Sequence, residues 1–325
     1  MNEFELINRF FKASLEDHRV LLGIGDDAAL IAPIDGNVLA VSTDTLNEGR
    51  HFFSDVPPFT LGHKVMAVNL SDMAAMGAVP RFALLSGSLP DADFDWLSAF
   101  SRGFFALASK YRVSVIGGDT TRAAQGGRSF TVTIIGDVPE ALALKRSGAT
   151  TGDDIWVSGT IGDAALALRA MHNDLCWDAP DLARLRARLE TPSPRVELGM
   201  ALRGLASSAI DVSDGLTGDL SHVLKGSGVG ATVFLSALPA DPVLLKCLAD
   251  EKTRSLALSC ALAGGDDYEL CFTAPPENRA AIAALSTTLN LRLSRIGVIT
   301  DSQKLTVVDE QQNPISPLPA SFHHF

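Results

Sequence analysis

Aspartates recur along this chain where short apolar runs break into what look like turns. The six segments read GIGDDAA, STDT, VNLSD, IGGDT, IDVSDG and AGGDDYE, and they contain Asp26, Asp27, Asp44, Asp72, Asp119, Asp211, Asp214, Asp266 and Asp267. A carboxylate in an apolar setting is costly unless it is paired, hydrogen-bonded or bound to a metal. The repetition of this costly arrangement in six segments predicts that these carboxylates converge on cations. Hard oxygen ligands with few His or Cys nearby favour magnesium, which in proteins usually accompanies phosphate.

A structural role competes with metal binding in each segment. The aspartates of GIGDDAA could cap a helix. Asp72 could form a salt bridge or a cap, Asp119 could close an Asx turn, and the stretch 211–215 could cap a following helix. Residues 42–44 offer hydroxyl, carbonyl and carboxylate oxygens within one tight turn, which suits an octahedral ion. Each structural interpretation is reasonable once, but invoking one at every segment is not.

The motifs of several other enzyme classes are missing from the sequence. No G-x-x-x-x-G-K-[ST] occurs, which excludes an ordinary P-loop. A dinucleotide fingerprint starting at Gly23 would place Asp26 and Asp27 against a pyrophosphate, which argues against a Rossmann site. No Ser-His-Asp order, reactive-cysteine setting or H-E-x-x-H is found. A magnesium enzyme with few candidate bases fits phosphoryl transfer, best to an acceptor that is already an anion, such as a phosphate monoester.

The composition is that of a globular protein with room for two domains. The chain has 325 residues, of which 46% are hydrophobic and 20% charged. Its net charge of −11 argues against nucleic-acid and anionic-membrane partners, and bridging cations would reconcile that charge with phosphate ligands. The four cysteines are scattered and have no zinc spacing, which predicts reduced thiols. The start of the chain does not have the pattern of a signal peptide, so the protein is expected to be cytoplasmic.

Strand-like and helix-like segments alternate along both halves of the chain. Apolar periodicity predicts helices over 4–11, 61–76, 94–111, 163–172 and around 182–194. Clusters of β-branched residues predict strands over 38–42, 113–116, 130–138 and 154–158. The strand 113–116 is expected to end at the glycine pair, which would leave Asp119 at its tip. A basic, polar stretch after residue 139 places the boundary between domains 1–139 and 140–325, so the sequence predicts a two-domain mixed α/β (α+β) protein.

The whole set of motifs resembles one known family. GIGDDAAL, STDTLNEGRHF, AVNLSDMAAMGA, IGGDTTR, KRSGA, AIDVSDGL and GGDDYEL, in this order, resemble the thiamine-monophosphate kinase family, within the aminoimidazole-ribonucleotide synthetase and selenophosphate synthetase superfamily. The resemblance implies direct transfer of the γ-phosphate of ATP to thiamine monophosphate, with several Mg²⁺ ions. It also implies a homodimer in which the sheets of the metal- and ATP-binding N-terminal domains join into a barrel, and a C-terminal α/β domain that completes the active site.

The resemblance also assigns roles to residues of this chain. The implied magnesium ligands are Asp27, Ser42, Thr43, Asp44, Asp72, Asp119, Asp211 and Asp214. The implied ATP contacts are Gly118, Asp119, Arg146 and Ser213, and the catalytic centre would consist of Asp44, Asp72, Asp119 and Arg146. The implied substrate contacts are His51, Asp266 and Phe322. Asp266 stands where the family usually has glutamate, and Phe322 stands where Tyr or Trp is common.

Three alternatives stay open beside the kinase. A sister ATP-dependent synthetase is one; the selenophosphate enzyme should carry a reactive cysteine near its N-terminal glycine-rich segment, whereas the first cysteine here is Cys176. A magnesium-dependent phosphohydrolase would need a water-activating group, and no obvious candidate lies beside the aspartates. A non-catalytic ATP–magnesium sensor should have lost metal ligands, yet every matching position is filled. The kinase therefore explains the sequence best.

Overall fold

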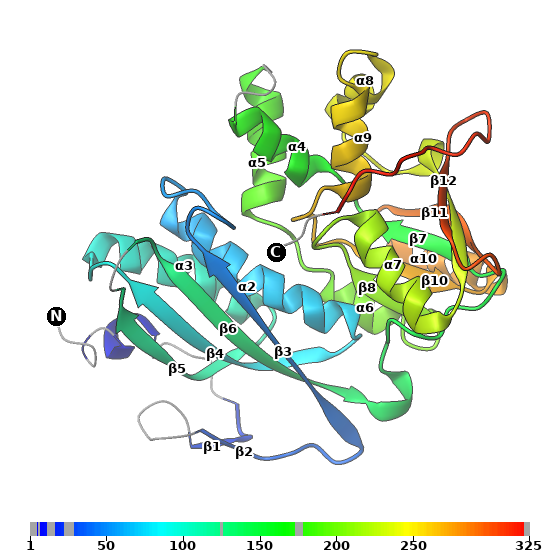
Figure 1. The fold of residues 1–325 in the computed structure, drawn as a ribbon. Helices are drawn as coiled ribbons and strands as arrows, with labels where there is room; N and C mark the ends of the chain where they lie inside the picture. Colours follow the sequence, from blue (N-terminus) through cyan, green and yellow to red (C-terminus); the bar gives the residue numbers. More distant parts are fainter. Residues whose placement is uncertain are drawn as a thin grey trace. The chain divides into compact units, whose positions relative to one another are not determined.

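A computed structural model describes residues 5, 7–11, 17–22, 29–123, 126–172 and 178–321 of the chain. The chain divides into two compact units, which are described separately (Figure 1). Unit 1 comprises Met1–Met73 and Ala78–Ala141, and unit 2 comprises Ala74–Gly77 and Leu142–Phe325.

Unit 1 is built on a four-stranded sheet with the strand order β3-β6-β4-β5. The strands are β3 (Asn37–Asn47), β4 (Val79–Leu89), β5 (Ser114–Arg122) and β6 (Ser129–Pro139). The pairs β3–β6 and β6–β4 are antiparallel, and β4–β5 is parallel. A separate antiparallel pair, β1 (Val20–Leu22) and β2 (Leu30–Ile31), precedes this sheet, and a short π-helical turn lies at Ile7–Phe11.

Two long helices, α2 (Pro58–Ala75) and α3 (Phe94–Lys110), cover one face of the unit 1 sheet (Figure 1). The ring of Phe100 in α3 stacks on Phe130 in β6, with 4.4 Å between ring centroids. The Asp93 side chain caps α3 by accepting hydrogen bonds from the backbone N–H groups of its first turn. Periodic apolar residues predict both helices within a few residues of their observed ends, because each buries one apolar side.

Two of the predicted strands are longer than expected. β3 runs from residue 37 to 47 rather than from 38 to 42, and β5 continues through its glycine pair to Arg122. The prediction that Asp119 lies at a strand tip is therefore wrong. Because the backbones of β5 and β4 pair in parallel over this stretch, the strand persists despite its polar, glycine-rich sequence.

Unit 2 contains a six-stranded sheet with the strand order β12-β9-β11-β7-β10-β8. All neighbours are antiparallel except β12 and β9. The strands are β7 (Asp154–Ser158), β8 (Ser208–Asp211), β9 (Gly230–Phe234), β10 (Leu270–Ala274), β11 (Leu293–Thr300) and β12 (Leu305–Val308). The helices are α4 (Asp163–Met171), α5 (Ala179–Glu190), α6 (Val196–Ala201), α7 (Leu216–Ser227), α8 (Pro242–Ala249), α9 (Arg254–Ala263) and α10 (Arg279–Thr288). Short 3₁₀ turns of unit 2 lie at Leu235–Ala237 and Pro276–Asn278, and another, Glu140–Leu142, lies where the chain passes from unit 1 to unit 2.

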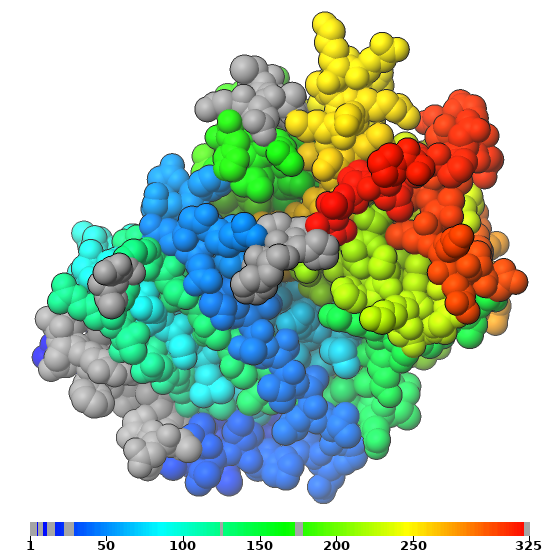
Figure 2. Space-filling view, viewed as in Figure 1, coloured from blue at the N-terminus to red at the C-terminus, as the bar shows by residue number. Residues whose placement is uncertain are grey.

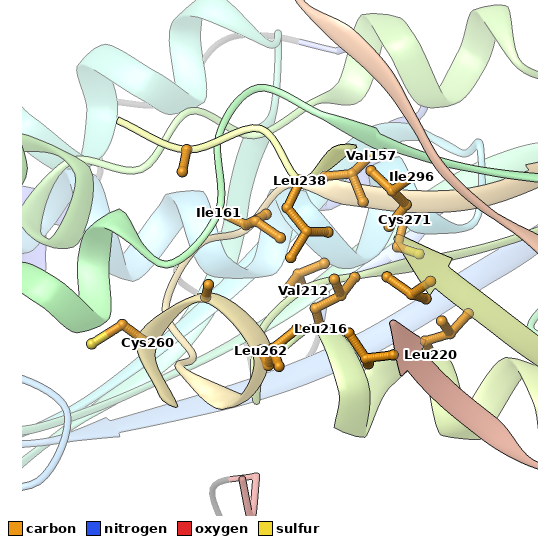
Figure 3. Packing of buried hydrophobic residues seen from close by; sticks show 14 of the residues in the cluster. Val157, Ile161, Val212, Leu216, Leu220, Leu238, Cys260, Leu262, Cys271 and Ile296 are labelled. Atoms are coloured by element: carbon orange, nitrogen blue, oxygen red, sulfur yellow. The ribbon is translucent and has the colours of Figure 1, made fainter. Parts of the chain in front are cut away.

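One apolar core holds the helices of unit 2 against its sheet. Val157 in β7 and Cys271 in β10 meet Leu216 and Leu220 of α7 in this core (Figure 3). All four are at most 1% exposed. Burial of this kind contributes on the order of 1.5–3 kcal/mol for each large side chain, so the start of α7 is firmly held.

Both units mix helices with sheets, which confirms the predicted two-domain mixed α/β class. Neither sheet closes into a barrel within the described part of this single chain. Apolar side chains are exposed on β1 and β3, among them Leu21, Leu39 and Val41. The space-filling view shows the N-terminal part of unit 1 in blue (Figure 2). Within the described ranges, no helix is both long enough and apolar enough to cross a lipid bilayer.

Candidate functional site

Ser42, Thr43 and Asp44 lie in the middle of β3 and not in a turn. Ser42 and Asp44 are half-buried, whereas Thr43 between them is exposed. Successive side chains of a strand point to opposite faces of its sheet. Ser42 and Asp44 therefore face the helices of unit 1, and Thr43 faces the opposite side, where its hydroxyl accepts a hydrogen bond from Thr133 at 3.2 Å. The prediction of one tight turn is wrong because β3 pairs with β6 along its whole length.

Asp72 approaches this strand from α2. It lies one turn before the end of the helix and is half-buried. Ser42 Oγ donates a hydrogen bond to Asp72 Oδ2. The structure thus brings two of the predicted ligands, Ser42 and Asp72, into direct contact on the helix-covered face of the sheet, the same face to which Asp44 belongs.

Gly118 and Asp119 lie on β5, at the opposite side of the sheet from β3. Two strands separate β3 from β5, so their backbones are about 14 Å apart at a spacing of ~4.8 Å. Asp119 in β5 pairs with Ser86 in β4, and Ser86 lies across β6 from Thr45 in β3. Paired residues point to the same face of a sheet, so Asp119 shares a face with Thr45 and therefore with Thr43. Unit 1 therefore divides the predicted ligands between two sheet faces: Ser42, Asp44 and Asp72 on one, and Thr43 and Asp119 on the other.

Gly118 has a clear geometric reason to be glycine. Its φ of +156° lies at the edge of the region that disfavours other residues, and a Cβ there would come 1.9 Å from the carbonyl oxygen of Leu85 in β4. The glycine pair therefore allows close packing of β5 on β4 beside Asp119.

His51 follows β3, and its backbone N–H donates to the carbonyl oxygen of Asn47 at 2.9 Å. The backbone N–H of Asn47 donates to His51 Nδ1 at 2.9 Å, which leaves the proton of the neutral imidazole on Nε2. Lys64 Nζ donates to the carbonyl oxygen of His51 at 3.2 Å. Lys64 is 3% exposed on α2 and was not predicted from the sequence, although a lysine within the apolar run HKVMAVNL is a usable signal.

In unit 2, the segment 211–215 connects β8 to α7. Asp211 is buried at the end of the strand, Ser213 is half-buried and Asp214 is exposed. The competing interpretation, in which the stretch 211–215 caps α7, is not what the structure shows: the residue before the helix is Gly215, which offers no side-chain cap. Asp219, four residues after Gly215, caps the segment instead. Burial raises the pKa of Asp219 to about 7, against the lowering effect of the backbone N–H donors.

The GGDDYEL motif runs beside this segment. The N–H of Asp266 donates to the carbonyl oxygen of Ser213 at 2.9 Å, and the N–H of Tyr268 donates to that of Val212 at 2.8 Å. Asp266 is half-buried, with a φ of +68°, and accepts a hydrogen bond from the Tyr268 hydroxyl at 3.2 Å. The structure therefore brings Asp266 next to Ser213, two residues to which different roles were assigned.

The other two acids of GGDDYEL are buried. Asp267 Oδ2 accepts the N–H of Gly162 at 2.7 Å, and burial raises its pKa well above the usual value. Glu269 is fully buried and is bound by Arg188, Arg195 and Ser158. No local pattern predicts these partners, because they lie 74 to 111 residues from Glu269.

Arg146 is exposed, and its carbonyl oxygen accepts a hydrogen bond from Ser227 Oγ at 3.4 Å. Ser227 is the last residue of α7, whereas Ser213 precedes the first turn of that helix. A helix of 12 residues is about 18 Å long. The backbones of Arg146 and Ser213 therefore lie near opposite ends of α7, and only a long side chain or an extended ligand could connect them.

Two predicted site residues, Asp27 and Phe322, lie outside the described residues. The residue before Phe322, Ser321, is described, and its hydroxyl lies 3.5 Å from that of Thr217 in the first turn of α7. Among the described residues, no three His, Cys, Asp or Glu side chains are grouped closely enough to hold a metal by themselves.

The sequence matches two family models. One, described as AIR synthase related protein, N-terminal domain, matches residues 25–138; the other, for the C-terminal domain, matches residues 150–310. The thiamine-monophosphate kinase of Salmonella typhimurium is 46% identical over 299 residues, which cover 91% of this chain and 89% of that protein. That of Bacillus subtilis is 33% identical, over 95% of this chain and 94% of that protein.

Solved structures agree with these matches. The crystal structure of thiamine-monophosphate kinase from Stenotrophomonas maltophilia K279a superimposes with a TM-score of 0.85 at 48% identity, over 94% of this chain and 96% of that one. A structure described as AaThiL complexed with AMPPCP and TMP gives 0.78 at 28% identity, over 90% and 89%. The hydrogenase maturation protein HypE of Escherichia coli, at 20% identity, TM-score 0.80 and 97% coverage of both chains, shares the fold. The chain therefore belongs to the thiamine-monophosphate kinase family, as its motifs predicted.

Proposed function

We propose that this protein transfers the γ-phosphate of ATP directly to thiamine monophosphate, giving thiamine diphosphate and ADP. The observation that carries this proposal is 46% identity to a thiamine-monophosphate kinase over 91% of the chain. The related structure described with AMPPCP and TMP supports a nucleotide and a thiamine phosphate as the two ligands. At neutral pH the acceptor phosphate is already largely ionised, so the enzyme has little need of a general base.

We propose that Asp27, Ser42, Thr43, Asp44, Asp72, Asp119, Asp211 and Asp214 hold several Mg²⁺ ions. The described members fit this role because all of them offer hard oxygen donors, and Ser42 and Asp72 are already in contact. Bound magnesium would neutralise the charge of the donor and acceptor phosphates. Ser42, by donating to Asp72, would fix the orientation of that carboxylate.

The remaining site residues would bind the two substrates. We propose that Gly118, Asp119, Arg146 and Ser213 contact ATP, and that His51, Asp266 and Phe322 contact thiamine monophosphate. Arg146 would supply a guanidinium for the phosphates. His51, with Nδ1 occupied by the Asn47 N–H, would present Nε2–H as a donor. Phe322 could stack on the thiazolium cation, with a contribution on the order of 1 kcal/mol.

We also propose that the protein works as a cytoplasmic homodimer. β3 is an edge strand of the unit 1 sheet, and Leu39 and Val41 on its helix-free face are 64% and 61% exposed. Exposed apolar side chains on an edge strand favour pairing with another chain. Joining of two such sheets into a barrel would cover them. Light scattering of Leu39→Lys/Val41→Lys should show a monomer where the wild type is a dimer; a monomeric wild type would refute the proposal.

A coupled ADP-release assay tests the activity. We expect turnover with ATP, Mg²⁺ and thiamine monophosphate, no turnover with thiamine or without acceptor, and thiamine diphosphate as the chromatographed product. Hydrolysis of ATP without an acceptor would instead indicate a phosphohydrolase. ATP binding without turnover on any acceptor would indicate a sensor or a sister synthetase.

Substitution of the proposed ligands tests the site. We expect Asp44→Asn and Asp72→Asn each to lower kcat by at least a hundredfold with the fold intact. Asp35→Asn, in the exposed turn before β3, is the matched control and should keep full activity. Near-normal turnover of both ligand variants would remove these residues from the metal site.

A further inference from the structure

Three consecutive backbone N–H groups in the β8–α7 loop point at one oxygen atom. Ser213, Asp214 and Gly215 donate to Asp219 Oδ2 over 3.0, 3.1 and 3.1 Å. Asp219 is only 4% exposed and belongs to α7. Adjacent N–H groups that converge in this way form a concave nest for an anion, the arrangement that cradles phosphate in other proteins.

The group that fills this nest is the Asp219 carboxyl, which is part of the chain itself. A carboxylate near the start of α7 is favourable because the helix dipole places partial positive charge there. Because Asp219 already uses all three N–H groups, a phosphate of the substrate cannot use them as well. The loop must therefore meet its ligands through the side chains of Ser213 and Asp214, whose direction the loop backbone sets.

Both ends of the loop are also anchored. Val212 before it and Leu216 after it lie in the apolar core of unit 2 (Figure 3) and are at most 1% exposed. Gly215 has a φ of +111°, and a Cβ there would come 2.5 Å from the carbonyl carbon of Ala263 in α9. With its ends fixed by packing, the loop can change course through its polar backbone groups. Asp219 holds three of their N–H groups, and the N–H of Asp266 holds the carbonyl oxygen of Ser213.

The same loop carries the next site segment. Ser213 accepts the N–H of Asp266 through its carbonyl oxygen at 2.9 Å. A rotation of the peptide planes around Ser213 would therefore displace Asp266 as well. The nucleotide-side residue Ser213 and the acceptor-side residue Asp266 depend on one backbone conformation.

We propose that Asp219 is a positioning residue, which fills the N–H nest of residues 213–215 and so sets the direction of Ser213, Asp214 and, through Ser213, Asp266. The roles of those three residues rest on the proposed function. The part played by Asp219 in the loop conformation does not, and it can be measured separately.

The first experiment measures the loop itself, by amide hydrogen exchange of the wild type and of Asp219→Ala. Asp241 provides a matched control, since it is a buried aspartate that caps α8 in the same unit. We expect the amides of residues 213–215 to be protected in the wild type and in Asp241→Ala, and to exchange at least tenfold faster in Asp219→Ala. Equal exchange in Asp219→Ala and the wild type would overturn the proposal.

The second experiment measures catalysis. We expect Asp219→Ala to raise KM for both ATP and thiamine monophosphate and the Mg²⁺ concentration for half-maximal rate, each at least fivefold. Asp219→Asn, which keeps one acceptor oxygen, should recover most of this loss and provides the test if the alanine variant does not fold. Losses no larger than those of Asp241→Ala, or no recovery in Asp219→Asn, would overturn the proposal. If the wild type were inactive but showed the expected exchange pattern, the kinase function would be refuted, whereas the proposal that Asp219 holds the loop would stand.

Discussion

The buried carboxylate of Glu269 should be one of the most sensitive positions in unit 2. Its Oε2 accepts hydrogen bonds from Ser158 Oγ and from Arg195 Nε, both at 2.6 Å. Its Oε1 accepts one hydrogen bond from the guanidinium of Arg188 and one from that of Arg195. The side chain is fully buried, while the two arginines are about one-fifth exposed. We predict that Glu269→Gln, which keeps the volume of the side chain, destabilises this region strongly.

The loss of stability expected for Glu269→Gln follows from the contacts of the Glu269 carboxylate. Glutamine has one acceptor oxygen in place of two, and its amide N–H groups would face donors of the partners. About two of the four charge-assisted hydrogen bonds would be lost, at roughly 1.5–3 kcal/mol each. Removing one partner of a buried ion pair typically costs about 3–5 kcal/mol, because the remaining charges stay uncompensated. We therefore expect a loss of about 3–5 kcal/mol.

Amide hydrogen exchange in β10 measures this loss locally, without assuming that both units unfold together. The control is Glu190→Gln, which removes the partly exposed pair Arg186–Glu190 of α5. That pair should contribute no more than about 0.5 kcal/mol. If Glu269→Gln lowered the opening free energy of β10 by less than about 1 kcal/mol, the reasoning from unpaired buried charge would be wrong.

Three further predictions concern stability and reactivity. Hydrogen bonds from Arg19 lower the pKa of Asp17 from 3.8 to about 2. Asp17 should therefore contribute about 2 kcal/mol to the free energy of unfolding above pH 3.8, and this contribution should be lost as the pH falls through 2. Urea titrations should show the difference between the wild type and Asp17→Asn at pH 7 but not below pH 2. Burial raises the pKa of Cys260 and Cys271 to about 12, so mass spectrometry should find both thiols unmodified by iodoacetamide in the native protein at pH 8 and modified in denaturant; native labelling would contradict this. A Cβ at Gly103 in α3 would come 1.9 Å from a backbone carbonyl oxygen of α2, so Gly103→Ala should cost about 1–3 kcal/mol in urea unfolding, whereas a gain would mean that helix propensity outweighs the clash.

Local pattern was enough to predict much of the fold. The helix predicted over 61–76 is α2 at 58–75, and that predicted over 94–111 is α3 at 94–110. Each buries an apolar side whose spacing is visible in the sequence. The strand predicted over 38–42 stops short of Thr43 and Asp44, because the residues from Ser42 to Asp44 are polar on both faces. Pairing with β6, about 90 residues away, makes it a strand.

The sequence by itself determined the family and the two-domain mixed α/β class, because these depend on residue types in a fixed order. Only the tertiary structure decided which oxygen meets which donor. It placed Thr43 on the opposite sheet face from Ser42, joined Asp266 to the loop of Ser213, and gave Asp219 the N–H groups of that loop. Such contacts depend on strand pleat and on segments far apart in the chain, which no local pattern records.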